Sequence, residues 1–203
     1  SRLISEKNDF IQEEISYFYD ADGNLKEVYR RPYADSEWVY REEYIYSAAN
    51  VNQLQKVTQY NLKTNVSKEL FTVNVYDNLG NPCNYSGNVL KWERGRILRE
   101  FGQNKYAYNS DGIRQEKTTA EGVFHKYYTS GGKILGEEIK SGDKTNYYRY
   151  LYVGEQVTGF VINNRDHYFY QYNAAGDVAR ICDETGEIVA QYRYDAWGNS
   201  RIY

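Results

Sequence analysis

The sequence predicts an all-β protein of repeated antiparallel β-hairpins that form a continuous curved or spiralling sheet. Tyrosine, which favours the pleated, half-buried surface of a strand, makes up 24 of the 203 residues. A short unit with a glycine four residues after a tyrosine also recurs, and such self-similarity indicates a repeat architecture. The repeated residues are Tyr19, Asp20 and Gly23; Tyr76, Asp77 and Gly80; Tyr108 and Gly112; Tyr128 and Gly132; Tyr172 and Gly176; and Tyr194, Asp195, Trp197 and Gly198.

Each unit has the chemistry of half a hairpin. Tyr192 and Tyr194 alternate, which places both rings on one face of a strand. Asp195 then suits the first position of a type I turn and Gly198 the fourth. We therefore interpret these residues as a structural repeat motif.

The N-terminal third contains less regular hairpins. Residues 15–19 and 25–29 predict the first one, after a lead-in at residues 1–12 that is either a strand or a short helical segment. Pro32 interrupts the pattern within residues 31–37, because proline cannot donate to a strand ladder. Strands are expected at 38–46, 54–62 and 69–75. The glycine-less turn at 47–50 could continue as a helical turn, and the register before Tyr76 stays open.

The rest of the chain is more regular. Residues 89–92 and 97–101 flank Gly95 and form the densest apolar cluster, so we expect much of the local core there. Beyond it, marker tyrosines stand at positions 108, 128, 152, 172 and 194, with 152 an imperfect member. Each step holds two strands and two turns, and units this short must stack to bury their apolar faces. We predict one repeat region, irregular over 1–75 and regular over 76–203, cut from a longer polypeptide.

Composition argues against several functions. The net charge is -3 and the charges are scattered, which is unlike the basic footprint of a nucleic-acid binder. The absence of a long apolar run argues against membrane insertion. Cys83 and Cys182 are too few for a disulfide framework, and we interpret them as partly buried free thiols, although sequence does not exclude a bridge.

No catalytic, cofactor or metal site is predicted, and we do not expect an enzyme. Asp20-x-Asp22-Gly23 differs from a calcium-binding EF-hand loop, which has glycine sixth and glutamate twelfth; here glycine is fourth and Arg31 is twelfth. His125 and His167 lack the ligand spacing of metal sites and are interpreted as strand residues. Paired carboxylates of a glycoside hydrolase remain a third hypothesis that sequence cannot place.

Together these motifs resemble the Rhs-repeat family, also called YD-repeat proteins. The resemblance rests on Tyr-Asp-x-x-Gly-Asn at Tyr19 and Tyr76, the run from Asn81 to Arg96, the run from Tyr108 to Arg114, and Tyr-x-Tyr-Asp-Ala-Trp-Gly-Asn at 192–199. It covers nearly the whole chain. It implies a large bacterial secreted or cell-surface protein, similar to wall-associated proteins and to the C components of insecticidal toxin complexes.

In such relatives the repeats spiral into a hollow β-shell around a variable C-terminal toxin. The self-cleavage segment that normally follows the repeats is not in this sequence, so autoproteolysis and toxicity are not assigned. The first hypothesis is therefore a non-catalytic structural module whose partners are the remainder of its own chain and a C-terminal effector. The alternative is a surface that binds glycans or a protein through tyrosines at 147–152 and 168–172, although cross-strand ring pairing explains them more simply.

Overall fold

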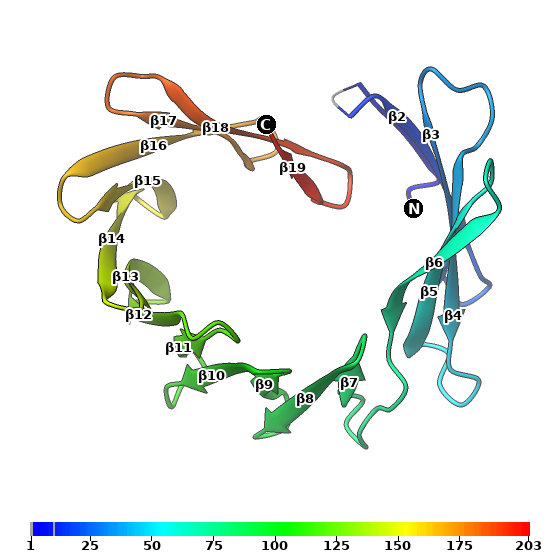
Figure 1. The fold of residues 1–203 in the computed structure, drawn as a ribbon, viewed down its shortest axis with the longest axis horizontal. Helices are drawn as coiled ribbons and strands as arrows, with labels where there is room; N and C mark the ends of the chain where they lie inside the picture. Colours follow the sequence, from blue (N-terminus) through cyan, green and yellow to red (C-terminus); the bar gives the residue numbers. More distant parts are fainter. Residues whose placement is uncertain (1, 10) are drawn as a thin grey trace. The chain divides into compact units, whose positions relative to one another are not determined.

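The computed structural model describes residues 2–9 and 11–203, and the regular elements in this part are nineteen β-strands. The chain divides into two compact units (Figure 1). The first comprises the residues up to Lys91 together with Tyr194–Asn199, and the second comprises Trp92–Arg193 and Ser200–Tyr203. The boundary falls at residues 91 and 92, whereas the sequence becomes regular at Tyr76.

The first unit contains a six-stranded antiparallel sheet whose strands follow each other in chain order. Short turns join neighbouring strands, as successive hairpins require. The strands are β1 (Ser5–Asn8), β2 (Glu13–Tyr19), β3 (Leu25–Pro32), β4 (Tyr40–Tyr46), β5 (Leu54–Asn61) and β6 (Val66–Thr72).

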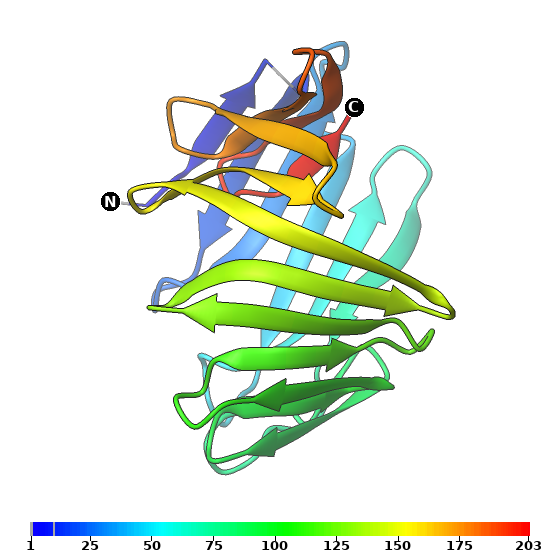
Figure 2. The same cartoon turned by 90° about the vertical axis from the view of Figure 1, so that its left-hand side faces the viewer.

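A second sheet has thirteen strands, again in chain order. Figure 2 shows the green to orange strands of the second unit side by side. The strands are β7 (Asn84–Tyr85), β8 (Asn88–Glu93), β9 (Ile97–Phe101), β10 (Asn104–Tyr108), β11 (Arg114–Thr118), β12 (Phe124–Ser130), β13 (Lys133–Ser141), β14 (Lys144–Val153), β15 (Gln156–Ile162), β16 (Asp166–Tyr172), β17 (Val178–Asp183), β18 (Ile188–Tyr194) and β19 (Ser200–Ile202).

The all-β prediction is confirmed, but the ladder is interrupted between β6 and β7. Isolated hydrogen bonds replace it there: the Cys83 N–H donates to the Val75 carbonyl over 2.8 Å, and the Ser86 N–H to the Thr72 carbonyl over 2.7 Å. Pro82 lies in this segment and has no N–H to give. The predicted continuous sheet is therefore two sheets.

One local prediction needs correction, and the structure decides between two pairs of alternatives. The strand expected at 69–75 is β6, which begins at Val66 because Asn65 takes a left-handed conformation (φ 56°) and closes the hairpin early. The turn after β4 contains no helical segment; the Ser47 N–H donates to the Gln53 carbonyl instead. The lead-in before the first hairpin forms a strand, β1.

The main buried cluster lies in the first unit, not around Gly95. It consists of Ile11, Ile15, Tyr17 and Val28, with partly buried residues packed against it. The apolar run in β8 does not become a core because alternate residues of a strand face opposite ways. Leu90 is buried while Val89 is 58% exposed.

Candidate functional site

Seven turns share one backbone geometry. The N–H of the first residue donates to the carbonyl of the fifth, and the fourth residue, a glycine, donates its N–H back to the carbonyl of the first. The glycine has φ between 77° and 94°, a left-handed conformation in which other residues are strained. The turns begin at Asp20, Asp77, Asn109, Thr119, Asn173, Asp183 and Asp195.

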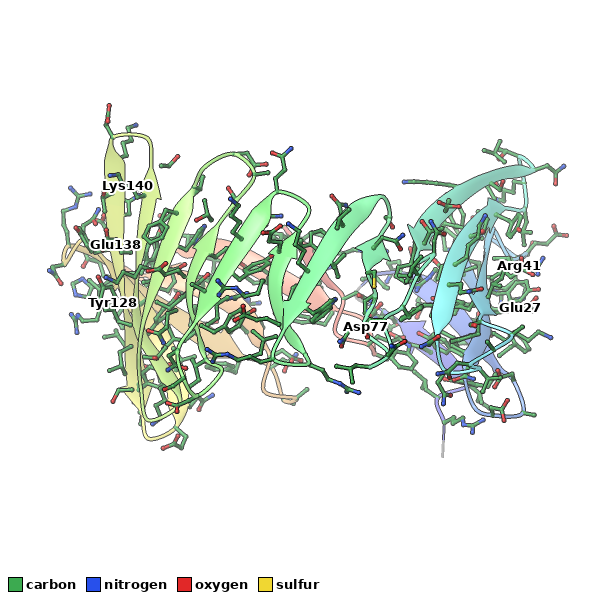
Figure 3. The ribbon with its side chains drawn as sticks, turned by 90° about the horizontal axis from the view of Figure 1, so that it is seen from below. Glu27, Arg41, Asp77, Tyr128, Glu138 and Lys140 are labelled. Atoms are coloured by element: carbon green, nitrogen blue, oxygen red, sulfur yellow. The ribbon has the colours of Figure 1, made fainter. Side chains whose placement is uncertain are left out.

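The side chain of the first residue completes each turn. In the second copy, the Asp77 Oδ1 accepts the N–H groups of Leu79 (2.9 Å) and Asn81 (2.8 Å), and its Oδ2 accepts the Asn81 amide over 2.8 Å (Figure 3). Asn173 and Asp195 accept from the corresponding positions of their turns. The motif carboxylates are therefore engaged with their own backbone.

Marker tyrosines make a second recurring contact. In five hairpins a tyrosine hydroxyl donates to a backbone carbonyl near the start of an earlier strand, beside the turn. Tyr46 reaches the Leu25 carbonyl over 3.0 Å, and Tyr152 the Ile134 carbonyl over 2.9 Å. Tyr19, Tyr76 and Tyr172 do the same to Leu3, Leu54 and Val157. We call these contacts tyrosine staples, because each ties a hairpin to the strand before it.

A bulge sets the position of the staple. The register shifts immediately before Tyr19, Tyr46, Tyr108, Tyr152 and Tyr172. A bulge bends the strand and re-aims the next side chain. Four of these five tyrosines, Tyr19, Tyr46, Tyr152 and Tyr172, make the staple contact.

Tyr128 differs from the tyrosines that form staples. The register shifts after it, and Gly131 and Gly132, both at positive φ, form a tighter turn. Thr129 is therefore the residue directly after the bulge in β12, the position that Tyr152 has in β14. Tyr128 is 45% exposed, and its hydroxyl donates to Glu138 over 3.0 Å (Figure 3).

The last motif copy packs within the first unit, to which Tyr194–Asn199 belong. The Trp197 ring meets the Tyr17 ring edge-on, with centroids 5.6 Å apart. The Ala196 N–H donates to Glu6 over 3.1 Å, and the same carboxyl group accepts the Tyr17 hydroxyl over 3.0 Å. Trp197 thus contacts Tyr17 with one ring edge, although it is 54% exposed.

The tyrosines at 147–152 and 168–172 contact mainly one another and the sheet. Tyr150, Phe160 and Tyr168 stand directly opposite on β14, β15 and β16 and so share one face. The rings of Phe160 and Tyr168 stack at 5.0 Å. Burial, together with the charge of Glu137, raises the pKa of Tyr150. Such cross-strand pairs stabilise a sheet by about 0.2 to 1 kcal/mol each, and they need no ligand. Tyr147, by contrast, is 54% exposed.

Comparison with known proteins agrees with these repeats. No protein-family model matches the chain. The chain is 31% identical over 193 residues to the tRNA nuclease WapA of Bacillus subtilis (strain 168), and equally to the tRNA3(Ser)-specific nuclease WapA of Bacillus spizizenii. Each match covers 91% of this chain and 8% of the relative. A chain of the Photorhabdus luminescens Tc holotoxin pore shares the fold over 92% of this chain and 12% of its own length, with a TM-score of 0.56 and 14% identity.

This chain belongs to the Rhs-repeat family. Its turns and staples are therefore Rhs repeat elements, and the chain spans less than a tenth of the length of these curated relatives.

The Rhs segment has one close histidine–carboxylate pair that sequence reasoning missed. His125 Nδ1 lies 2.7 Å from Glu137 Oε1, and the Tyr150 hydroxyl donates to Glu137 Oε2 over 3.3 Å. His125 also stacks on Tyr127. These neighbours of the pair are therefore aromatic. A catalytic triad would also require a serine or cysteine nucleophile, and none is among these contacts. His167 Nδ1 lies 3.0 Å from the Arg165 carbonyl and, at the longer distance of 3.7 Å, from Glu184 Oε2.

A comparable polar cluster lies in the first unit. Glu42 is 7% exposed and accepts hydrogen bonds from Tyr44 (3.2 Å) and Gln59 (3.1 Å), with Arg30 at 3.4 Å. These partners come from β3, β4 and β5. A buried carboxylate needs such partners, so this cluster favours one register of the three strands.

The other predicted residues do not form a chemical centre. Cys83 and Cys182 are free thiols, half-buried and buried respectively. Among residues 2–9 and 11–203, no group of three or more His, Cys, Asp or Glu side chains is arranged to hold a metal ion. The same residues contain no helix with the length and hydrophobicity needed to cross a bilayer.

Several structural residues escaped the sequence analysis. The turn from Thr119 to Gly122 has the same spacing as Asp-x-x-Gly, and its threonine hydroxyl accepts the Val123 N–H over 3.2 Å, so the spacing could have revealed it. Gly159 lies inside an apolar strand. A glycine there signals close backbone approach.

Proposed function

We propose that this chain is a non-catalytic structural module of a bacterial secreted or cell-surface Rhs protein. In this proposal it forms part of a β-shell that encloses or displays a C-terminal polymorphic toxin. The tyrosine staple is the observation that carries the proposal. A contact that repeats from hairpin to hairpin serves the continuity of a sheet, whereas a catalytic site needs one unique constellation.

The use of polar groups supports a structural role. The turn carboxylates and amides accept backbone N–H groups, and the staple hydroxyls donate to backbone carbonyls. The functional groups that define the repeat are thus occupied inside the protein. Removal of these groups should lower the stability of the folded protein and should not affect a chemical reaction.

The relatives support the shell and the location. Two are nucleases named WapA, and the structural match belongs to a Tc holotoxin pore. This chain matches a small share of each, as expected of one portion of a repeat wall. A toxic activity in the parent would then reside outside these residues.

Protease protection of the full-length parent tests the proposal. The parent would carry Tyr46→Phe and Tyr152→Phe together, with Tyr147→Phe as the control. We expect any segment enclosed by the shell to be cleaved several-fold faster in the double variant, while its activity after release is unchanged. If that segment is cleaved in the wild-type parent as fast as when isolated, the shell role is wrong. Catalytic turnover by the 203-residue chain itself would overturn the non-catalytic assignment.

A further inference from the structure

The last motif turn, residues 195–199, uses all but one of its backbone N–H groups to hold its own shape. The turn itself accepts the N–H groups of Asp195, Trp197, Gly198 and Asn199. The N–H of Ala196 instead donates to Glu6 Oε1 over 3.1 Å. Because six other turns have the same backbone geometry, each offers an N–H at the equivalent second position.

The receiving side is built within the first unit by Glu6 and Asn8 of β1 and Tyr17 of β2, which we call the turn socket. Asn8 Nδ2 donates to Glu6 Oε1 over 2.8 Å, and the Tyr17 hydroxyl donates to Glu6 Oε2 over 3.0 Å. Asn8 is 9% exposed, and its Oδ1 accepts the Ile11 N–H over 3.2 Å. The socket residues therefore hold one another in place, and such preorganisation lowers the entropy lost when a segment docks.

Asn8 also contacts the docked segment directly. Its Nδ2 donates to the Tyr194 carbonyl over 3.1 Å, so one nearly buried amide bonds both the socket carboxylate and the arriving chain. Glu6 and Asn8 together thus bind an N–H and a carbonyl that lie two residues apart. Every residue except proline supplies both groups. These two contacts therefore recognise the backbone shape of the turn and not its sequence.

The third residue of the turn makes the contact that depends on sequence. The Trp197 ring meets the Tyr17 ring edge-on, with centroids 5.6 Å apart. Burial raises the pKa of Tyr17, and a side-chain hydrogen bond from Trp197 opposes that rise. Both the ring and the indole N–H of tryptophan are therefore used. The other six turns have no tryptophan at this position; their third residues are Asp22, Leu79, Asp111, Glu121, Ala175 and Thr185.

Charge adds discrimination against three of these turns. Asp22, Asp111 and Glu121 would bring a carboxylate to the place of the Trp197 side chain. That place adjoins Tyr17, whose hydroxyl is bonded to the Glu6 carboxylate. Like charges brought together in this way disfavour the wrong partner.

We propose that the turn socket is a recognition site for an Asp-x-Trp-Gly turn, occupied by residues 195–199, and that Trp197 selects this turn from the seven of equal backbone geometry. The hairpin of β1 and β2 then accepts one particular repeat and rejects others of the same shape. This selection is independent of whether the parent encloses a toxin.

Amide hydrogen exchange of the 203-residue chain, followed by NMR, tests the selection, because the Ala196 amide exchanges when its bond to Glu6 opens. Trp197→Leu copies the third residue of the Asp77 turn and should accelerate this exchange about threefold through loss of the ring pair. Trp197→Asp adds a like charge and should accelerate it about tenfold. Leu79→Asp, at the equivalent exposed position of the Asp77 turn, is the matched control and should leave the rate unchanged.

Glu6→Gln separates selection from a contact that only adds stability. In the wild-type background it should accelerate exchange of the Ala196 amide about threefold, since a neutral acceptor bonds an N–H less strongly than a carboxylate does. In the Trp197→Asp background the same change should slow exchange, since it removes the repulsion. A reversal of sign that depends on residue 197 is expected only where the two positions interact.

Three results would overturn the proposal, each with folding verified by circular dichroism. The first is a wild-type Ala196 amide that exchanges as fast as an unprotected one. The second is equal exchange in wild type, Trp197→Leu and Trp197→Asp, or equal acceleration by Leu79→Asp and Trp197→Asp. The third is acceleration by Glu6→Gln in both backgrounds, because the charge of Glu6 would then not exclude the acidic turns.

Discussion

Gly159→Ala should be among the most damaging single-methyl changes in the second unit. Gly159 has an ordinary strand conformation, so its backbone does not require glycine. A Cβ built there would lie 2.2 Å from the Tyr168 carbonyl oxygen and 3.1 Å from the Phe169 Cα. Both atoms belong to the backbone of the neighbouring strand β16. The clash therefore cannot be relieved by rotating a side chain.

The cost follows from that distance. Ordinary contact of a Cβ begins at 3.4 Å, so β15 and β16 must separate by about 1.2 Å at this point. Overpacking a well-fitted site costs about 1 to 3 kcal/mol, and a backbone neighbour puts this case near the upper end. We expect unfolding to become easier by about 3 kcal/mol, with the Phe160 and Tyr168 ring stack displaced.

Urea denaturation followed by circular dichroism measures the effect, with Gly142→Ala as the matched control. Gly142 has φ 58° and no atom within 4 Å of a built Cβ, so its cost is conformational only, about 1 kcal/mol. Hydrogen exchange in β16 should accelerate for Gly159→Ala alone. If the two variants lose equal stability, or Gly159→Ala loses less than 1 kcal/mol, close strand approach at this position is wrong.

Three further perturbations test the turns and the tyrosines. Gly198→Val, at φ 81° with no atom within 4 Å of a built Cβ, should cost more than about 1 kcal/mol through strain alone, and an unchanged melting temperature would contradict that conformation. Asp77→Ala should cost about 1 kcal/mol or more by removing the acceptor for two backbone N–H groups and for the Asn81 amide. Asp77→Asn should cost less, because its oxygen still accepts the two backbone N–H groups, as asparagine does in other turns, and only the bond from the Asn81 amide is lost; equal loss in both would refute the turn role. Burial raises the pKa of Tyr17, Tyr44 and Tyr150 in the folded protein. The stability that these protonated tyrosines contribute is fully present below about pH 10 and should be lost as the pH rises through their pKa values in the folded state. Spectrophotometric titration should therefore show their phenolates appearing together with unfolding; phenolates that form near about pH 10 in an intact sheet would contradict this.

Sequence reasoning predicted the all-β architecture and the turn chemistry because both depend on local residues. Asp77 and Gly80 determine their turn within five residues, and the same holds for the turn from Asp195 to Gly198. Tyr128 was placed one residue off for a physical reason. Its glycines support two different turns, and the choice depends on pairing with β13, which the local sequence does not specify.

Features that depend on distant partners were not predictable. The staple acceptor of Tyr152 is a carbonyl eighteen residues earlier, and any residue type supplies a carbonyl. The contact between His125 and Glu137 requires the register of β12 and β13. The bond from the Ala196 N–H to Glu6 joins residues 190 positions apart in the chain, which no local pattern specifies.

The central claim is that the hydroxyls of five tyrosines, Tyr19, Tyr46, Tyr76, Tyr152 and Tyr172, tie their hairpins to the preceding strand. It is tested most directly by comparing Tyr152→Phe with Tyr147→Phe. Both changes remove one hydroxyl from the same strand, β14. The Tyr152 hydroxyl is bonded to the Ile134 carbonyl, while the Tyr147 side chain is 54% exposed. In urea denaturation we expect Tyr152→Phe to lose about 1 kcal/mol and Tyr147→Phe to stay within about 0.5 kcal/mol of wild type. Equal stabilities of the two variants would contradict the account.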